Sequence, residues 1–168
     1  VCCVLVGKDK PVAIGSLERF LADWEMENTP RPSLSPIGGE DKGEGADKVA
    51  VAGSGPAGLT AAAELAKFGY RVTLFESLSS SGGVLRYGIP EFRLPRKILD
   101  METDYIGSLG VEINYNILIG RTFTIEDLFK DGYKAIFIGT GAGLPYFIGI
   151  PGENLNGVYS ANEFLTRV

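Results

Sequence analysis

Residues 49–76 constrain the fold of this chain more than any other stretch. Small apolar residues at 49–52 lead into Gly53, Gly55 and Gly58, and an alanine-rich segment and a second apolar run follow. The pattern predicts a strand, a tight turn, a helix and a second strand. In such a βαβ unit the first glycine allows the turn, the second lets a pyrophosphate approach the backbone, and the third lets the helix pack closely on the strand.

The same unit predicts which dinucleotide it binds. The pyrophosphate is expected at the helix N-terminus, where unpaired N–H groups and the helix dipole favour an anion. Glu76 follows the glycines by roughly 20 residues, at the end of the second strand, where a carboxylate accepts hydrogen bonds from ribose hydroxyls. Because this carboxylate repels a 2′-phosphate, we expect the ADP half of FAD or NAD, and not NADP. The expected pyrophosphate-binding residues are Gly53, Ser54, Gly55, Pro56, Ala57 and Gly58.

A glycine pattern alone is most often a turn with no ligand. Here the flanking strands, the helix and the terminal acid are all present, which argues against that alternative. Histidine is absent, so Ser-His-Asp and Cys-His catalysis and most catalytic zinc sites are excluded. Cofactor-borne hydride transfer suits such a chain, because the protein then mainly positions the cofactor. No catalytic side chain is assigned.

The net charge and the lack of targeting segments indicate which partners and which location to expect. The net charge is −5 and no basic run is present, so neither a nucleic acid nor an anionic membrane is expected as a partner. No secretory signal is visible, and a cytoplasmic location is expected. The uncharged residues 135–152 contain five glycines and two prolines, which do not suit a membrane helix. They are predicted to form a buried strand and glycine-rich loops.

Three segments are expected along the chain. Residues 1–28 contain a helix with one apolar face, and residues 29–47 form a linker rich in proline, glycine, serine and charge. Residues 48–168 alternate strands and helices, which predicts an α/β, Rossmann-like domain with a parallel, doubly wound sheet. The cofactor is expected at the carboxyl ends of its strands.

Further elements are expected within the third segment. A helix is predicted over 96–109, a strand over 111–119 and another over 133–138. Thr124 and Ser160 each precede an acid by three residues, which predicts two helices that begin with capping boxes. The second of these helices looks interrupted by the end of the sequence, as expected of a fragment.

The motifs beyond the glycine turn resemble one family. Gly82-Gly83 and residues 87–95, 139–143 and 150–155 are similar to segments of the small (beta) subunit of NADPH-dependent glutamate synthase. The similarity runs from about Cys3 to the end of the chain. The flavin subunit of NADH-dependent ferredoxin:NADP oxidoreductase and the amino-terminal part of dihydropyrimidine dehydrogenase resemble the chain too, and the sequence does not separate these relatives.

The resemblance implies an FAD domain, an inserted NADPH domain and iron-sulfur clusters bound by an N-terminal cysteine-rich domain. NADPH gives hydride to the flavin, and electrons pass through the clusters to a large (alpha) subunit that makes glutamate, or to a ferredoxin-type partner. Residues 1–28 then correspond to a remnant of the iron-sulfur domain, and Cys3 to a cluster ligand in a full-length protein only. The NADPH domain and the final flavin segment are absent from the 168 residues. The chain alone is therefore expected to be an inactive part of a flavin-dependent NAD(P)H oxidoreductase.

The resemblance also implies which residues contact FAD. The glycine turn would hold the pyrophosphate, and Glu76 the adenosine ribose. The other expected contacts are Gly83, Val84, Leu85, Gly88, Ile89, Arg93, Ile119, Thr140 and Gly141. Arg93 is a forked donor suited to a phosphate, and a surface ion pair with Glu91 is the alternative. A hypothesis from another class is a non-catalytic dinucleotide-binding module that holds its cofactor as structure.

Overall fold

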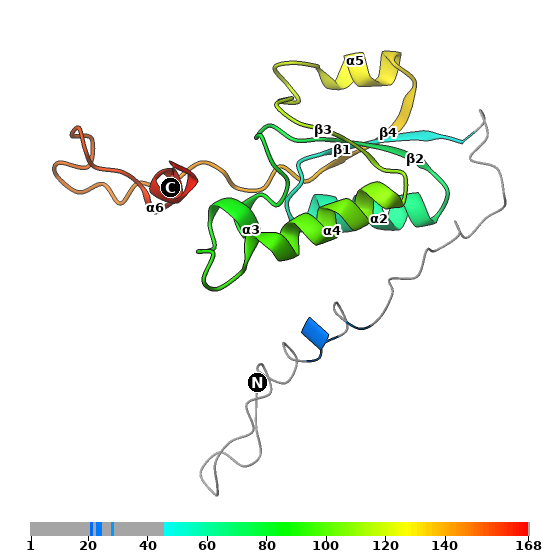
Figure 1. Cartoon of the computed structure of the whole chain (residues 1–168). Coiled ribbons are helices and arrows are strands. Elements are labelled where there is room, and N and C mark those ends of the chain that lie inside the picture. The colour runs from blue at the N-terminus through cyan, green and yellow to red at the C-terminus, as the bar shows by residue number, and fades with distance from the viewer. Residues whose placement is uncertain (1–20, 22, 25–27, 29–45, 168) are drawn as a thin grey trace, which may run out of the picture. The chain divides into compact units, whose positions relative to one another are not determined.

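The computed structural model describes residues 46–167 together with residues 21, 23, 24 and 28 (Figure 1). The chain divides into two units, Val1–Ser33 and Leu34–Val168. In the first unit Leu21, Asp23, Trp24 and Asn28 are helical, as predicted. The remaining expectations for residues 1–28 and nearly all of those for residues 29–47 lie outside the described residues, so the assignment of an iron-sulfur remnant and a linker stays a prediction.

Four parallel strands form the sheet of the second unit (Figure 1). The spatial order is β3-β2-β1-β4. The chain therefore moves outward from β1 through β2 to β3 and then returns to the other side of β1. In sheets of this kind ligands bind at the carboxyl edge where the strand order reverses, here between β1 and β4. The predicted Rossmann-like fold is confirmed. The strands are β1 (Lys48–Ala52), β2 (Arg71–Phe75), β3 (Glu112–Asn114) and β4 (Tyr133–Ile138).

Helices cover both faces of this sheet (Figure 1). On one face α2 (Pro56–Lys67) and α4 (Arg96–Ser108) pack over Val51, Val72 and Leu74. On the other face α5 (Ile125–Lys130) places Leu128 against Ala50, Phe75 and Tyr133. Since alternate strand residues point to opposite faces, the short apolar strands can supply both layers of core.

Both predicted capping boxes are present. Thr124 Oγ1 accepts a hydrogen bond from Asp127 N at 3.1 Å, and the Asp127 carboxylate accepts from Thr124 N at 3.0 Å. The Thr124 hydroxyl and amide hold the pKa of Asp127 below its usual value. Ser160 and Glu163 make the equivalent pair at the start of α6 (Ala161–Arg167). A short helix that the sequence did not predict, α3 (Val84–Tyr87), precedes α4.

Two predictions about strands are wrong. The strand expected over 111–119 ends at Asn114, because Asn116 has φ 60° and turns the chain away from β2. Asn116 N and Ile117 N then donate to Leu78 O and Glu76 O, at 3.1 and 2.9 Å, so this segment crosses the end of β2. The strand expected to be buried, β4, is exposed at most of its residues, because it lies at the edge of the sheet.

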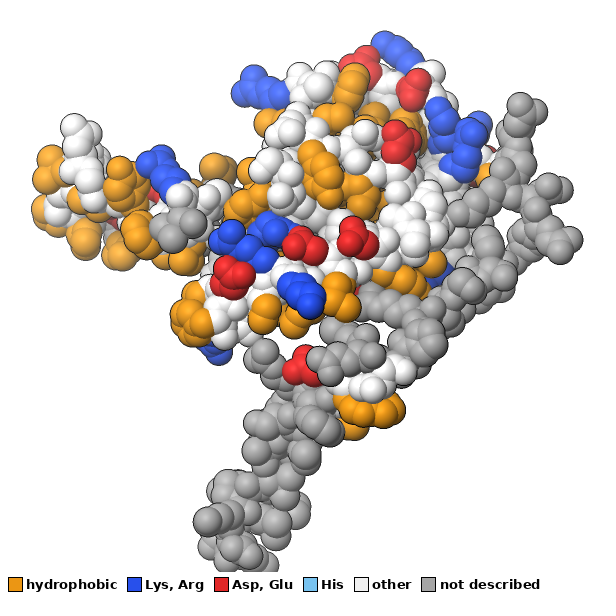
Figure 2. All heavy atoms as spheres, in the orientation of Figure 1, with side chains coloured by type: hydrophobic (Ala, Val, Ile, Leu, Met, Phe, Trp, Pro, Cys, Tyr) orange, Lys and Arg blue, Asp and Glu red, His pale blue; other side chains and the backbone are white. Residues whose placement is uncertain are grey.

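The segment after β4 carries an apolar surface. Figure 2 shows hydrophobic side chains gathered on the part of the chain that includes α6. The most exposed are Leu144, Tyr146 and Ile148. Within the described part of the chain, no helix has the length and apolar character needed to cross a membrane.

Gly58→Ala is expected to lower the free energy of unfolding by at least about 2 kcal/mol, because overpacking forces shifts in a close-packed backbone. The added methyl carbon would lie 1.8 Å from Gly53 O. Gly107→Ala is the control, since Gly107 lies exposed in α4 with nothing within 4 Å of an added methyl. There the higher helix propensity of alanine should stabilise the chain by up to about 1 kcal/mol. Urea unfolding followed by circular dichroism measures both, and equal stability of Gly58→Ala and the parent chain would contradict this packing.

Candidate functional site: a dinucleotide cleft

The turn between β1 and α2 has room for glycine alone at two of its three glycine positions. Gly53 has φ 100°, and a methyl group there would lie 2.5 Å from Gly139 O. At Gly58 the added methyl meets the backbone of Gly53. At Gly55 nothing lies within 4 Å, and the backbone has the ordinary values φ −67°, ψ 178°. Gly53 and Gly58 thus serve the fold, and Gly55 borders open space.

The N-terminus of α2 suits a phosphate group. Gly55 is the N-cap residue, and no side chain caps the helix by a hydrogen bond. Pro56 occupies the first turn, which contains no acidic residue. Free backbone N–H groups and the positive end of the helix dipole therefore face the same space as Gly55, as an anion site requires.

A cleft of about 720 Å³ lies at this edge of the sheet, a volume within the range of cofactor sites. Its walls come from the carboxyl ends of β1, β2 and β4, as the strand order predicts. The predicted residues that line it are Gly53, Ser54, Gly55, Pro56, Ala57, Glu76, Gly83, Val84, Gly88, Ile119, Thr140 and Gly141. Four predicted residues do not line it: Gly58, Leu85, Ile89 and Arg93. Since no ligand is present, the cofactor contacts themselves stay predictions.

Several lining residues were missed by the sequence reasoning. Ser77 and Leu78 follow Glu76, and Ile117 and Leu118 precede Ile119. Their only signal was adjacency to predicted contacts. Tyr87, Asn162 and Thr166 come from α3 and α6, and nothing local in the sequence predicts that these helices reach the cleft.

Glu76 is buried and already holds four hydrogen bonds. Its Oε2 accepts from Ser54 N at 2.8 Å and from Ser54 Oγ. Its Oε1 accepts from Leu78 N at 2.8 Å and from Ser77 Oγ at 3.1 Å. A carboxylate offers about four lone-pair positions, so all are used within the protein. Ser77 is exposed, and its hydroxyl is therefore the donor that a ribose hydroxyl could replace.

Ser54 lies at the cleft, and its side chain points into the protein. The side chain is fully buried, donates to Glu76 and accepts from Gly82 N at 3.3 Å. The same Gly82 N donates to Ser54 O at 2.9 Å. Ser54 therefore connects the β1–α2 turn to the loop before α3, a link that the sequence did not reveal.

That loop forms the second wall of the cleft. Gly83 has φ 51°, and a methyl group on it would lie 3.0 Å from Gly55 Cα, so the two backbones are in direct proximity. Gly88 follows α3, where an added methyl would lie 2.7 Å from Val84 Cγ2. Gly83 is favoured by its positive φ, and a side chain at Gly88 would force Val84 to shift. Both glycines line the cleft, and their contact with a cofactor stays a prediction.

Arg93 lies away from this wall. Its side chain is exposed, and its backbone N–H donates to Pro90 O at 2.9 Å. Glu91 is 4.0 Å from Arg96 Nε. The structure thus gives no cleft contact for Arg93, and its role in binding a phosphate stays a prediction.

No group of three or more potential metal ligands occurs among the described residues, and Cys3 lies outside them. The donor set at the cleft instead fits a dinucleotide. It combines an uncapped helix N-terminus for a pyrophosphate, a carboxylate at the end of β2 for ribose, and a glycine-lined wall for a flat ring system. The residues that are present therefore fit the expected cofactor.

Comparison with known proteins identifies the family. A model of the pyridine nucleotide-disulphide oxidoreductases matches residues 47–166. The chain is 42% identical to the NADP(+)-dependent formate dehydrogenase subunit beta of Moorella thermoacetica over 87% of its length and 23% of that protein. It is 39% identical to the NAD-dependent dihydropyrimidine dehydrogenase subunit PreT of Salmonella typhimurium, over 98% of the chain and 38% of that protein. It is 34% identical to the small chain of the NADPH glutamate synthase of Escherichia coli, over 97% of the chain and 33% of that protein.

A solved structure agrees with these matches. Mycobacterium tuberculosis FprA in complex with NADPH has a TM-score of 0.64 and 25% identity, over 72% of this chain and 28% of that one. The chain belongs to the pyridine nucleotide-disulphide oxidoreductase family. The resemblance to the glutamate synthase small subunit is confirmed, and the chain spans between 23% and 38% of the length of the three relatives above.

Glu76→Gln is expected to lower the free energy of unfolding of the ligand-free chain by about 1–3 kcal/mol, the cost of leaving a buried donor unpaired. An amide accepts at one end only, so either Ser54 N or Leu78 N would face an NH₂ group. Glu112→Gln is the control, because Glu112 is exposed and its Oε1 accepts from Asn114 at 3.1 Å, a bond that the amide keeps. Denaturant unfolding without cofactor measures both variants. Unchanged stability of Glu76→Gln would show that the four hydrogen bonds contribute nothing to folding.

Proposed function

We propose that this chain is the FAD-binding part of a flavin-dependent NAD(P)H oxidoreductase subunit that passes electrons from NADPH through FAD to iron-sulfur clusters. The observation that carries the proposal is the cleft at the carboxyl ends of β1, β2 and β4, where an uncapped helix N-terminus and a buried carboxylate meet. Family membership supports it. FAD supplies the hydride-accepting ring when it is bound, and the chain contributes binding and orientation.

Different residues of the cleft would bind different parts of the cofactor. Backbone N–H groups at the start of α2 would bind the pyrophosphate, and the open space at Gly55 would admit it. Glu76 would accept from a ribose hydroxyl in place of Ser77 Oγ. The wall of Gly83, Val84 and Gly88 would lie along the flavin half. These residues would bind and orient the cofactor, and no catalytic residue is assigned.

Glutamate synthesis is the narrower form of the proposal. The resemblance in residues 87–95 and 150–155 supports it, with a large amidotransferase subunit as the partner. The relatives that resemble the chain at higher identity are named for formate and dihydropyrimidine dehydrogenation, which makes a ferredoxin-type or other electron-accepting partner the main alternative. A cytoplasmic location belongs to the same proposal.

The use to which the electrons are put, glutamate synthesis or reduction of another acceptor, can be tested on the native protein that contains these residues. It would be isolated with its bound partners and supplied with NADPH. Glutamate formation from glutamine and 2-oxoglutarate would support the narrower proposal. Reduction of another acceptor without glutamate formation would reject glutamate synthesis and leave the flavin oxidoreductase in place.

A non-catalytic binding module is the second candidate function. It is supported by the same cleft, whose named residues bind and orient a cofactor and carry no assigned catalytic role. In that case the native protein would hold stoichiometric FAD, and NADPH would fail to bleach the flavin absorbance. Rapid bleaching by NADPH would reject this candidate.

Gly55→Ala tests the binding site directly. The parent chain is expected to bind FAD and ADP saturably, and the variant to bind both at least about tenfold more weakly, a loss of ~1.4 kcal/mol, because the added methyl takes room from the cleft. Its fold should remain, since the backbone at Gly55 is ordinary and nothing lies within 4 Å of the methyl. Flavin fluorescence quenching and calorimetry with ADP measure the two affinities.

Gly107→Ala again serves as the control and should bind both ligands as the parent does. A parent chain that binds neither FAD nor ADP would contradict the proposed function. A Gly55→Ala variant that binds both with parental affinity would place the pyrophosphate elsewhere.

A further inference from the structure

We propose that Arg86 is a positioning residue for the flavin half of the cofactor, acting through the loop before α3 and not by contact. The inference rests on the proposed function for its ligand, and on the described contacts for its mechanism. Its starting point is that α3 has four residues. A helix of one turn is not stable by itself, so the wall of the cleft needs support from outside.

The backbone around α3 is also costly to hold. Gly82 has φ 119° and Gly83 has φ 51° with ψ −127°, and no side chain caps the helix. Glycine adopts these positive φ values without steric cost, but fixing its backbone costs more conformational entropy than fixing that of any other residue. Gly83 must nevertheless stay against Gly55 for the wall to exist. The loop therefore has to be held in place at the point where it borders the cleft.

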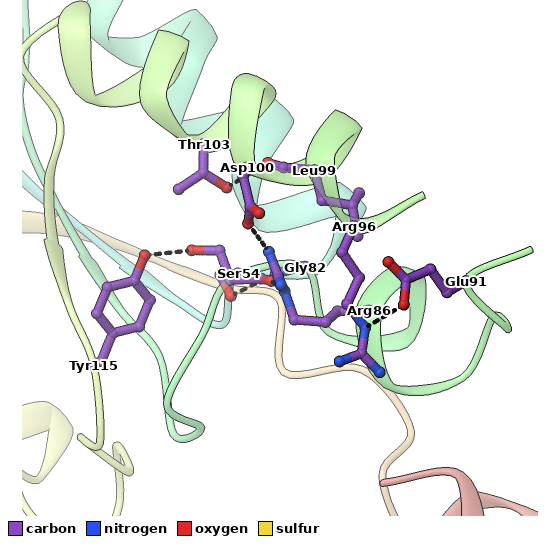
Figure 3. A network of polar contacts seen from close by, with 10 residues as sticks. Ser54, Gly82, Arg86, Glu91, Arg96, Leu99, Asp100, Thr103 and Tyr115 are labelled. Carbon is purple, nitrogen blue, oxygen red and sulfur yellow. Dashed lines mark hydrogen bonds and ion pairs between the residues drawn. The ribbon is translucent and has the colours of Figure 1, made fainter. Parts of the chain in front are cut away.

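Arg86 supplies the support from the side of α3 that faces away from the cleft. Val84, Tyr87 and Gly88 line the cleft, and Arg86 does not. Its Nε donates to Ser81 O at 2.6 Å, and its Nη2 donates to the Asp100 carboxylate on α4 (Figure 3). The side chain is only 12% exposed. It packs close to Gly82, where an added methyl carbon would lie 3.1 Å from Arg86 Cβ.

These two contacts join the loop to the core. A planar guanidinium donates in fixed directions at once, which a lysine ammonium on a flexible stem does not reproduce. Asp100 belongs to α4, which is anchored by the buried Leu99 and Ile106. Ser81 is also held from the other side, where its Oγ lies 2.9 Å from Tyr115 OH. Arg86 thus ties the loop before α3 to a rigid helix.

The positioning role predicts that losing Arg86 lowers the affinity for FAD and not the affinity for ADP. ADP should contact the turn at Gly55 and the carboxylate of Glu76, which Arg86 does not touch. FAD should need the wall of α3 in addition. Arg86→Met keeps most of the stem and removes the donors, so FAD should bind about tenfold more weakly, the usual effect of losing a charged hydrogen bond, while ADP affinity stays within about twofold. Arg86→Lys should recover little of the loss.

The experiment measures FAD and ADP affinities of the parent, Arg86→Met and Arg86→Lys, with Arg96→Met as the matched control. Arg96 lies on α4, is half exposed, and is paired only loosely with Glu91; its variant should bind both ligands as the parent does. Equal weakening of FAD and ADP by Arg86→Met would overturn the positioning role, and so would unchanged FAD affinity.

Hydrogen exchange tests the support without any ligand. The amides of residues 85–88 donate to Gly82 O, Gly83 O and Val84 O, and Arg86→Met should speed their exchange at least about tenfold while leaving the amides of β1 and β2 unchanged. If the parent binds neither ligand, the proposed function fails and exchange alone decides whether Arg86 holds the loop. Unchanged exchange at residues 85–88 would show that it does not.

Discussion

The close approach of backbone to backbone at Gly53 and Gly58 is the constraint on which the rest of the structure depends. A methyl group at either position would run into a carbonyl oxygen, of Gly139 in one case and of Gly53 in the other. This contact fixes where α2 leaves β1 and how near the β4 loop comes to the turn. The helix N-terminus, the ends of three strands and the cleft follow from it, because each is placed relative to the same few backbone atoms.

The part of the fold that depends on local pattern could be predicted from the sequence. Glycine spacing, apolar runs and capping boxes each involve neighbours in the chain, and the parallel sheet, the βαβ unit and both capped helices were predicted correctly. The strand over 111–119 was overextended because the alternation of apolar and polar residues continues through Asn116, although asparagine tolerates the left-handed backbone that turns the chain there. The prediction that β4 is buried was wrong, because an apolar strand has the same sequence pattern at the edge of a sheet as at its centre.

The candidate site shows the same division. Half of the residues that line the cleft were predicted as cofactor contacts, and most of those belong to the glycine motifs. The contacts that hold the cleft together were not predicted, since Glu76 meets Ser54 across 22 residues and Ser81 meets Tyr115 across 34. Such partners are set by packing, which no local pattern records. The Glu76 carboxylate therefore has two roles, since it stabilises the β1–α2 turn and is also proposed to bind the ribose.

The uncapped start of α2 affects how stable the folded chain is and how well it resists proteolysis. A helix end left open for an anion is less stable until the anion arrives, so the dinucleotide acts on the folding equilibrium as well as on chemistry. Free ligand at about a hundredfold excess over its dissociation constant adds ~2.7 kcal/mol to folding. A change of that size alters how much of a protein is lost to proteolysis. Cofactor supply would in this way set how much of the chain persists.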